Sequence, residues 1–367
     1  MPPLTSLASS ASLHRLARGL ALLPFTVLTA WCAAAVAWAP SGPAPTTWAL
    51  AAATAGACVM VGFGPLPRLV RGAAIRTATI TTVWGTIIAW FLLLPAPADA
   101  EWQPDVAQAP DFEIDGDLVT VSGIRHFRYG ATDLDFVPAW DDRTFDLRRI
   151  RTVDLFFSFW GPTLICHNFV SFGFERPDGA MEHVAVSIEA RKRRGQEYSA
   201  IGGLFRQFTL AYVWADERDV VGVRARQRGE HLRRYRIRAR PENVRILFER
   251  YMAATMQLAS EPRWYNAVTQ NCGIDILRTA WGQRMPLFPS PRLLLNGTWE
   301  EDAWEEGRIL PTASLEETLR AADITEDARA ADDADFGRAI RRRDVEMRTD
   351  APDQPSGPAS AAGTPSH

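Results

Sequence analysis

The sequence predicts an α+β domain that follows three membrane-spanning helices. Residues 19–95 are almost free of charged side chains and contain three apolar stretches, each near the ~20 residues that cross a bilayer. Residues 116–240 show short apolar–polar alternations separated by turn residues, which is typical of strands. From Pro241 onward, apolar residues recur at helical spacing.

The predicted spans cover about residues 19–38, 47–66 and 77–94, and none of them contains Lys, Arg, Asp or Glu. Arginines precede the first span and fill the loop between the second and third, whereas the 40–46 loop carries no charge. The positive-inside rule therefore places residues 1–18 in the cytoplasm. We expect the chain from about residue 100 to be periplasmic, in a multi-pass protein of a bacterial inner membrane.

Two alternatives stay open for this region. The first span is compatible with a cleaved signal peptide, although two further spans argue against cleavage. The small residues of Ala98–Ala100 follow an apolar run, and cleavage there would release the domain. Residues 96–115 are interpreted as an extended linker.

The polar part divides into a domain over residues 116–322 and a tail over 323–367. We expect the tail to be disordered, because it is rich in Ala, Asp and Arg and has almost no aromatic residues. Strands are predicted near 118–121, 127–130, 207–214 and 231–240, and in a hairpin of 168–174 with 182–190. Helices are predicted from Pro241 and over 272–281, with Gly282 as the stop.

Charge gives few clues to a partner. The net charge of −3 is small for 367 residues, and we expect no nucleic-acid partner, no metal and no cofactor. The run Asp216–Asp219 is interpreted as a salt-bridged turn rather than a metal site. The basic run Arg191-Lys192-Arg193-Arg194 and the arginines on one face of 234–240 are interpreted as a solvated face. Contact with anionic lipid headgroups is the alternative.

A thiol and an imidazole are the candidate catalytic groups. Cys272 lies at a predicted helix start, where the helix dipole favours thiolate. His167 heads the first strand of the predicted hairpin and would act as its base. The Cys272 amide would supply one oxyanion donor. Candidates for further oxyanion or substrate support are Asn271, Gln270, Tyr265 and Arg206.

The hairpin indicates a third residue. With the turn centred near Asp178, Glu189 lies opposite His167, and directly opposed residues share a face with Cβ atoms ~5 Å apart. Glu189 would then accept a hydrogen bond from the ring and orient it. Ser187 and His183 share the parity of Glu189 and are the reserves.

Structural explanations compete with this interpretation. A lone cysteine is most often a buried apolar residue, and a lone strand histidine is most often structural. A Cys166–Cys272 disulfide is also possible in an oxidising compartment. However, Cys166 and His167 are adjacent on a strand and therefore point to opposite faces.

The motifs at residues 167–174, 186–191, 203–208 and 215–219, together with Trp264–Asn266 and Asn271–Cys272, resemble the Lnb N-terminal periplasmic domain family of bacterial lipoprotein N-acyltransferases. The resemblance covers roughly residues 101–290. It implies a Cys-His-Glu triad at Cys272, His167 and Glu189. It also implies a permuted papain-like fold, similar to NlpC/P60-type enzymes and to lecithin:retinol acyltransferase. One departure is that the family's membrane region follows the catalytic domain, whereas here the spans precede it.

The resemblance implies an acyl chain that moves from phospholipid through a Cys272 thioester to an amine, that of a lipoprotein's N-terminal cysteine. The alternative is a thiol peptidase or amidase acting on cell-wall peptides. A binding module without catalysis is the third possibility. Membrane tethering favours the acyltransferase, because its acyl donor lies in the bilayer.

Overall fold

The computed structural model describes residues 10–39, 44–65, 72–161, 166–269, 272–281, 296–310 and 314–344. The chain divides into two compact units. The first contains residues 1–110, 188–213 and 250–285, and the second contains residues 111–187, 214–249 and 286–367. Each unit therefore brings together segments that lie far apart along the chain.

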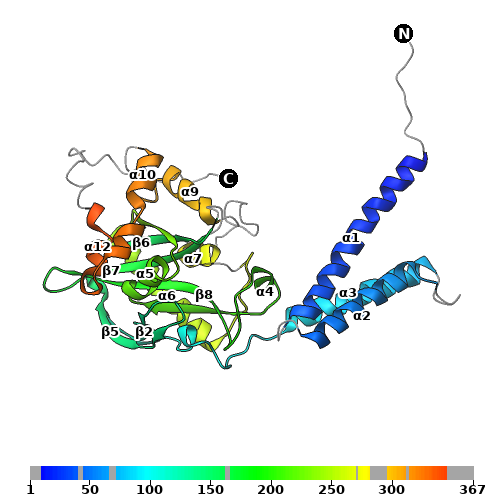
Figure 1. The fold of residues 1–367 in the computed structure, drawn as a ribbon, viewed down its shortest axis with the longest axis horizontal. Coiled ribbons are helices and arrows are strands. Elements are labelled where there is room, and N and C mark those ends of the chain that lie inside the picture. Colours follow the sequence, from blue (N-terminus) through cyan, green and yellow to red (C-terminus); the bar gives the residue numbers. More distant parts are fainter. Residues whose placement is uncertain are drawn as a thin grey trace, which may run out of the picture. The chain divides into compact units, whose positions relative to one another are not determined.

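The first unit begins with three helices that contact one another, α1 (Ser10–Trp38), α2 (Pro45–Phe63) and α3 (Ala73–Leu93) (Figure 1). Both α2 and α3 are long and apolar enough to cross a membrane. The apolar part of α1 is Leu22–Trp38, which is shorter. Two of the three expected spans are thus supported, and the span over residues 19–38 stays a prediction.

Arg76, near the start of α3, closes the end of α2. Its guanidinium donates hydrogen bonds of 3.1, 2.9 and 3.0 Å to the carbonyl oxygens of Val61, Gly62 and Gly64. Carbonyls in the last turn of a helix have no partner within it, and a cation suits the negative end of the helix dipole. Arg76 therefore links the two candidate spans.

The centre of the fold is an eight-stranded, mostly antiparallel sheet. Its main path runs β1-β2-β9-β8-β7-β6-β10, with β5 paired to β2. The strands are β1 (Asp111–Asp115), β2 (Leu118–Arg125), β5 (Trp140–Asp146), β6 (Ile150–Phe159), β7 (His167–Glu175), β8 (Met181–Arg191), β9 (Thr209–Ala215) and β10 (His231–Arg236). A separate ribbon pairs β3 (Arg128–Tyr129) with β4 (Phe136–Val137). The α+β prediction is confirmed, and the papain-like topology stays a prediction.

The helices of the polar part vary in length. The longest that the structure describes is α6 (Pro241–Ser260), which begins at the proline that predicted it. The other α-helices among the described residues are α4 (Ala200–Leu204), α5 (Glu217–Arg226), α7 (Cys272–Trp281), α9 (Trp299–Glu305), α10 (Leu315–Ala322), α11 (Thr325–Ala330) and α12 (Phe336–Ala339). Short 3₁₀ turns occur at Pro104–Val106, Leu147–Arg149, Asn296–Thr298 and Asp333–Asp335. The predicted stop at Gly282 lies outside the described residues.

One face of the sheet in the second unit is apolar and packs on α6. Phe248 of α6 lies edge-on to the rings of Phe172 and Phe174, with centroids 5.2 and 5.3 Å away. It meets Trp214 in the same way, at 5.3 Å. Edge-to-face pairs add stabilisation beyond the buried area of the rings. This buried aromatic cluster is part of the core of the unit.

The opposite face carries a buried ionic cluster. Asp154 of β6 is 0% exposed and accepts hydrogen bonds from Arg234 at 3.1 Å, from Arg236, and from Arg341 at 2.7 Å. Arg341 also donates to the buried carboxylate of Glu217, at 2.6 and 2.7 Å. The expectation of a solvated or lipid-facing arginine surface is therefore wrong for Arg234 and Arg236.

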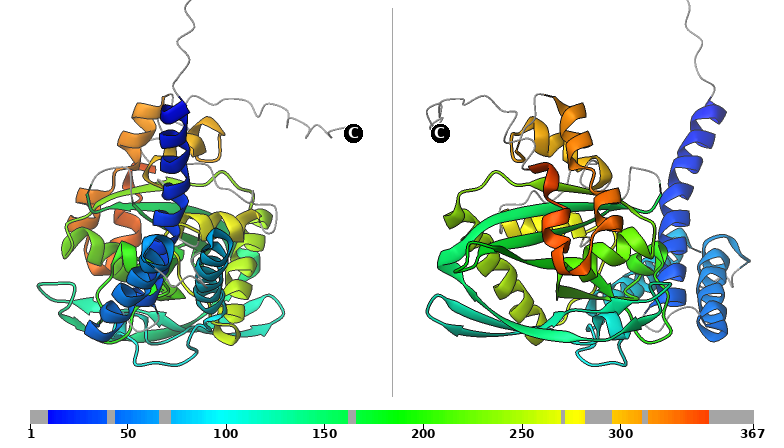
Figure 2. Two further views of the ribbon diagram at one scale, coloured as in Figure 1. Left: turned by 90° about the vertical axis from the view of Figure 1, so that its right-hand side faces the viewer. Right: turned by 60° about the vertical axis from the view of Figure 1, so that its left-hand side comes forward.

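The expectation of a disordered tail over 323–367 is wrong for residues 323–344, and residues 345–367 lie outside the described residues. This segment forms α11 and α12, which contact each other and α5, and Figure 2 shows it packed on the rest of the second unit. Phe336 and Ile340 are buried at 2% and 1% exposure. The tail has few aromatic residues overall. Phe336 and Ile340 nevertheless bury apolar side chains, and Arg341 adds ion pairs with Asp154 and Glu217.

Two further expectations need correction. Part of the predicted linker is folded, because β1 covers Asp111–Asp115 and pairs with β2. Arg191 is not a solvated side chain. Its guanidinium donates to the Val106 carbonyl at 2.9 Å and lies 4.4 Å from the Trp102 ring centroid. The segment before the domain thus contacts Arg191, which the sequence analysis had interpreted as part of a solvated face.

The acidic run begins a helix rather than forming a turn. Asp216 is the N-cap of α5 and accepts a hydrogen bond from the Arg218 amide. Asp219, which is fully buried, forms a salt bridge of 2.8 Å with Arg125 and also accepts the Phe127 amide. The interpretation as ion-paired carboxylates is confirmed, and the helix supplies the reason for their spacing.

Candidate active site

The β7–β8 hairpin has the register that its turn predicted. Phe169 pairs with Ser187 and Ser171 with Ala185, antiparallel. Gly179 closes the turn with φ +82°, which glycine adopts without strain. Within β7, a Cβ at Gly173 would lie 2.4 Å from Thr152 Oγ1, so the close approach of β6 needs a glycine there.

His167 begins β7 and is half-buried. Its Nε2 lies 2.7 Å from the Ser187 hydroxyl, which is fully buried. Its ring lies against Phe169, with centroids 5.8 Å apart and planes at 28°. A hydrogen bond on one side and a ring contact along the strand fix the orientation of the imidazole.

A second serine lies on the other side of His167. Ser158 of β6 is paired directly with His167, and its hydroxyl donates to the carboxylate of Glu230. Arg224 lies 3.9 Å from the same carboxylate, and its guanidinium is 5.2 Å from the Phe169 ring. Sequence reasoning missed Ser158 and Glu230. Only the pairing of β6 with β7 identifies Ser158, and Glu230 lies on a loop with no periodic pattern.

Cys166 lies directly before His167, the first residue of β7. Its sulfur accepts a hydrogen bond of 3.3 Å from Asn168 Nδ2, and the thiol is buried and not part of a disulfide. This arrangement matches the expected alternation, with Cys166 and His167 on opposite faces. The alternative of a Cys166–Cys272 disulfide is therefore wrong.

His183, one of the two reserves, belongs to the ionic cluster. It pairs with Gly173, further along the hairpin than His167. Burial, assisted by the charge of Arg341, lowers its pKa to about 4. His183 is therefore a neutral buried residue beside Glu217 and Arg341. Of the two reserves, only Ser187 contacts His167.

Glu189 follows Ser187 by two residues on β8 and thus lies on the same face of that strand. The confirmed register reaches Ser187. The role of Glu189 as the acid that orients His167 stays a prediction, with Ser187 as the observed partner of Nε2.

Cys272 is the first residue of α7, as predicted. Its side chain, and the whole of Gln270 and Asn271, lie outside the part that the structure describes. One turn later, Asp275 is 2% exposed and forms a 2.7 Å salt bridge with Arg278. Burial raises the pKa of Asp275 despite that cation. Residues three apart lie on the same face of a helix, so the spacing of Cys272 and Asp275 is a sequence signal for this carboxylate.

Comparison with protein families identifies this region. Residues 136–294 match the family model of the Lnb N-terminal periplasmic domain. This is the family whose motifs the sequence resembles. The matched segment includes His167, Ser187, Glu189 and Cys272. No curated protein and no solved structure matches the chain.

The match to the Lnb N-terminal periplasmic domain and the two apolar helices together indicate a membrane-anchored protein with a periplasmic domain. Within the first unit, the domain contacts the ends of the N-terminal helices. The Trp264 indole donates to the Leu94 carbonyl at 2.9 Å, and Gln207 donates to the Trp38 carbonyl. Trp264, in the segment that precedes Cys272, is therefore bonded to the C-terminal end of α3.

Arg206 and Tyr265 were candidates for substrate or oxyanion support. Arg206 donates to the Leu94 carbonyl at 2.7 Å, and its guanidinium lies 4.8 Å from the Phe91 ring. Its observed contacts are thus those of a cap on α3. The Tyr265 hydroxyl lies 3.4 Å from that of Tyr198, and its ring packs on Gly203.

Proposed function

We propose that this protein is a periplasmic thiol acyltransferase anchored in the inner membrane. The acyl donor is a phospholipid, and the acceptor is an amine, that of the N-terminal cysteine of a lipoprotein. In this proposal residues 1–18 and the Arg68–Arg76 loop are cytoplasmic. Cys272 is the nucleophile, and His167 is the general base and acid.

The proposed reaction has two steps, acylation of Cys272 and transfer of the acyl group to the amine. In the first, His167 takes the Cys272 proton, the sulfur bonds to the ester carbonyl carbon, and the carbon–oxygen bond to glycerol breaks. The proton then passes from His167 to the departing glycerol oxygen. In the second, His167 takes a proton from the incoming amine, the amide bond forms, and Cys272 leaves as a thiolate that is reprotonated.

The observation that carries this proposal is the link between the thiol-bearing segment and a candidate span. Trp264 is bonded to the end of α3, and Cys272 follows eight positions later in the same unit. Apolar side chains of the same unit stay exposed, among them Ile201, Leu204 and Val268. An acyl donor held in a bilayer would meet such a surface, whereas a soluble cell-wall peptide would not require it.

The hydrogen bond to Ser187 assigns the ring nitrogens. If Nε2 carries the proton and donates to Ser187, Nδ1 holds the lone pair that accepts the thiol proton. Glu189, on the same face of β8, would add a negative charge that stabilises the imidazolium. Ser187 is thus a positioning residue in this scheme.

Variants at these two positions separate the roles. We expect Ser187→Ala to lower kcat roughly 3- to 10-fold, the effect of one neutral hydrogen bond, and Ser187→Thr to restore most of it. Glu189→Gln should lower kcat by roughly 10²-fold or more, because the charge opposite the imidazolium is lost. The pH profile of kcat should shift only for Glu189→Gln. An equal loss in both variants without that shift would remove Glu189 from the proposed triad.

The proposal is tested by intact-protein mass spectrometry. The purified full chain, incubated with phospholipid in the absence of an amine acceptor, should gain the mass of one acyl chain, and peptide mapping should place it on Cys272. Cys272→Ala should show no adduct, whereas Cys166→Ala should keep it. An adduct formed only from cell-wall peptides would instead favour the thiol hydrolase. No adduct from either donor would refute the covalent mechanism.

A further inference from the structure

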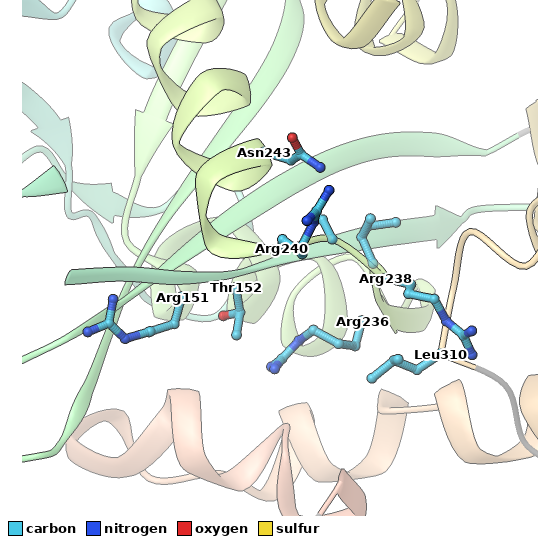
Figure 3. Close-up of a pocket in the computed structure, with 9 residues that line it drawn as sticks. Arg151, Thr152, Arg236, Arg238, Arg240, Asn243 and Leu310 are labelled. Carbon is cyan, nitrogen blue, oxygen red and sulfur yellow. The ribbon is translucent and has the colours of Figure 1, made fainter. Parts of the chain in front are cut away.

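A cavity of about 430 Å³ lies in the second unit where β10 ends and α6 begins. Its lining is cationic, and no acidic residue contributes to it. Figure 3 shows side chains from the start of β6, from the segment after β10 and from the first turn of α6 around it. The four cationic residues are Arg151, Arg236, Arg238 and Arg240.

Two of these four guanidiniums are already neutralised. Arg151 forms a 2.9 Å salt bridge with Glu175, and Arg236 is bonded to Asp154. Arg238 and Arg240 are exposed, and neither forms an ion pair with any residue that the structure describes. The cavity therefore retains two uncompensated positive charges.

Neutral groups of the lining also suit an anion. The Thr152 hydroxyl is buried and has no hydrogen-bond partner among the described residues. Asn243 lies in the first turn of α6, where the helix dipole is positive. The guanidinium group of arginine can donate two parallel hydrogen bonds to the oxygens of a phosphate. Leu310, which is 51% exposed, adds an apolar wall. A phosphate attached to an apolar body matches both kinds of surface.

We propose that this cavity binds the phosphate of an anionic phosphate ester. The site is distinct from the one at His167. Thr152 lines the cavity, whereas Ser158, six residues further along β6, is the residue paired with His167. At ~3.3 Å per residue this separation is ~20 Å. In a glycerophospholipid the acyl esters lie only a few bonds from the phosphate, so a lipid bound here does not present its ester to His167.

The occupant is therefore a phosphate-bearing molecule other than the acyl donor undergoing reaction. The inference does not depend on thiol chemistry, and a binding measurement tests it without turnover. Calorimetric titrations of the full chain in neutral detergent use three probes, which are dioctanoyl phosphatidylglycerol, inorganic phosphate and dioctanoylglycerol. We expect the first to bind, with an affinity that falls as salt is added, and the last not to bind.

The decisive variant is Arg238→Gln with Arg240→Gln, which should weaken phosphatidylglycerol binding at least tenfold. The matched control, Arg320→Gln with Arg338→Gln, removes the same charge from exposed helix surfaces and should leave binding unchanged. If the double variant does not fold, the same titration is carried out on the single Arg238→Gln variant.

Tight binding of inorganic phosphate, lost in the double variant, would support the site and assign it to a soluble phosphate compound. Binding of the lipid alone would assign it to a headgroup. Absence of binding by both phosphate probes, or an equal loss in the control, would overturn the proposal.

Discussion

His167→Ala is expected to lower kcat/KM for acyl transfer by about 10³-fold or more, because one group serves as base and acid in both steps. Cys272→Ala should abolish transfer. Since the two residues act as a unit, the double variant should be little worse than Cys272→Ala alone. The measurement is transfer of a labelled acyl chain from phospholipid to a peptide with an N-terminal cysteine.

His126→Gln is the matched control, because it removes another partly exposed imidazole of the same unit. It should retain nearly full activity. Full activity in His167→Ala would show that the histidine is structural, and the assignment of a general base would then be lost even if Cys272 proved essential.

Arg341→Met is expected to lower the free energy of unfolding by about 3–5 kcal/mol, the cost of leaving a buried ionic partner uncompensated. Arg341 is the link between Asp154 and Glu217, which are 0% and 3% exposed. Burial alone would raise the pKa of Asp154, but the charges of Arg234, Arg341 and Arg236 outweigh it and lower the pKa. Chemical denaturation of the detergent-solubilised chain measures the change.

The control is Arg338→Met in α12, three residues before Arg341, because the Arg338 side chain is 86% exposed. It should change stability by less than about 0.5 kcal/mol. A similar loss in both variants would mean that the C-terminal segment contributes through its packing rather than through the buried cation.

The same cluster makes the fold sensitive to acid. The pKa of His183 is lowered to about 4. Its side chain therefore takes up a proton near pH 6.5 in the unfolded chain but only near pH 4 in the folded chain. Burial opposes ionisation of Glu217, but Arg341 and His183 outweigh it and lower its pKa to about 2. Both groups bind more protons when unfolded, so stability falls as pH drops from about 6.5 to 2. Denaturation midpoints should decrease across this range.

Local patterns in the sequence determined much of the framework. The turn near Asp178 set the register of β7 with β8 as far as Ser187. Pro241 marked the start of α6, and Cys272 that of α7. These features depend on residues within one turn or hairpin, where backbone geometry and side-chain parity leave few alternatives. The choice of His167 and Cys272 as candidates also came from the sequence.

Tertiary structure alone decided which charges are buried together. Arg234 and Arg236 alternate as a surface strand would, yet they meet Asp154 under a C-terminal segment whose Arg341 is 187 residues from that carboxylate. The same holds for Ser187 as the partner of Nε2, since composition cannot rank a serine and a glutamate two residues apart. Pairing energy depends on which distant groups share a low-dielectric environment, and no local pattern encodes that.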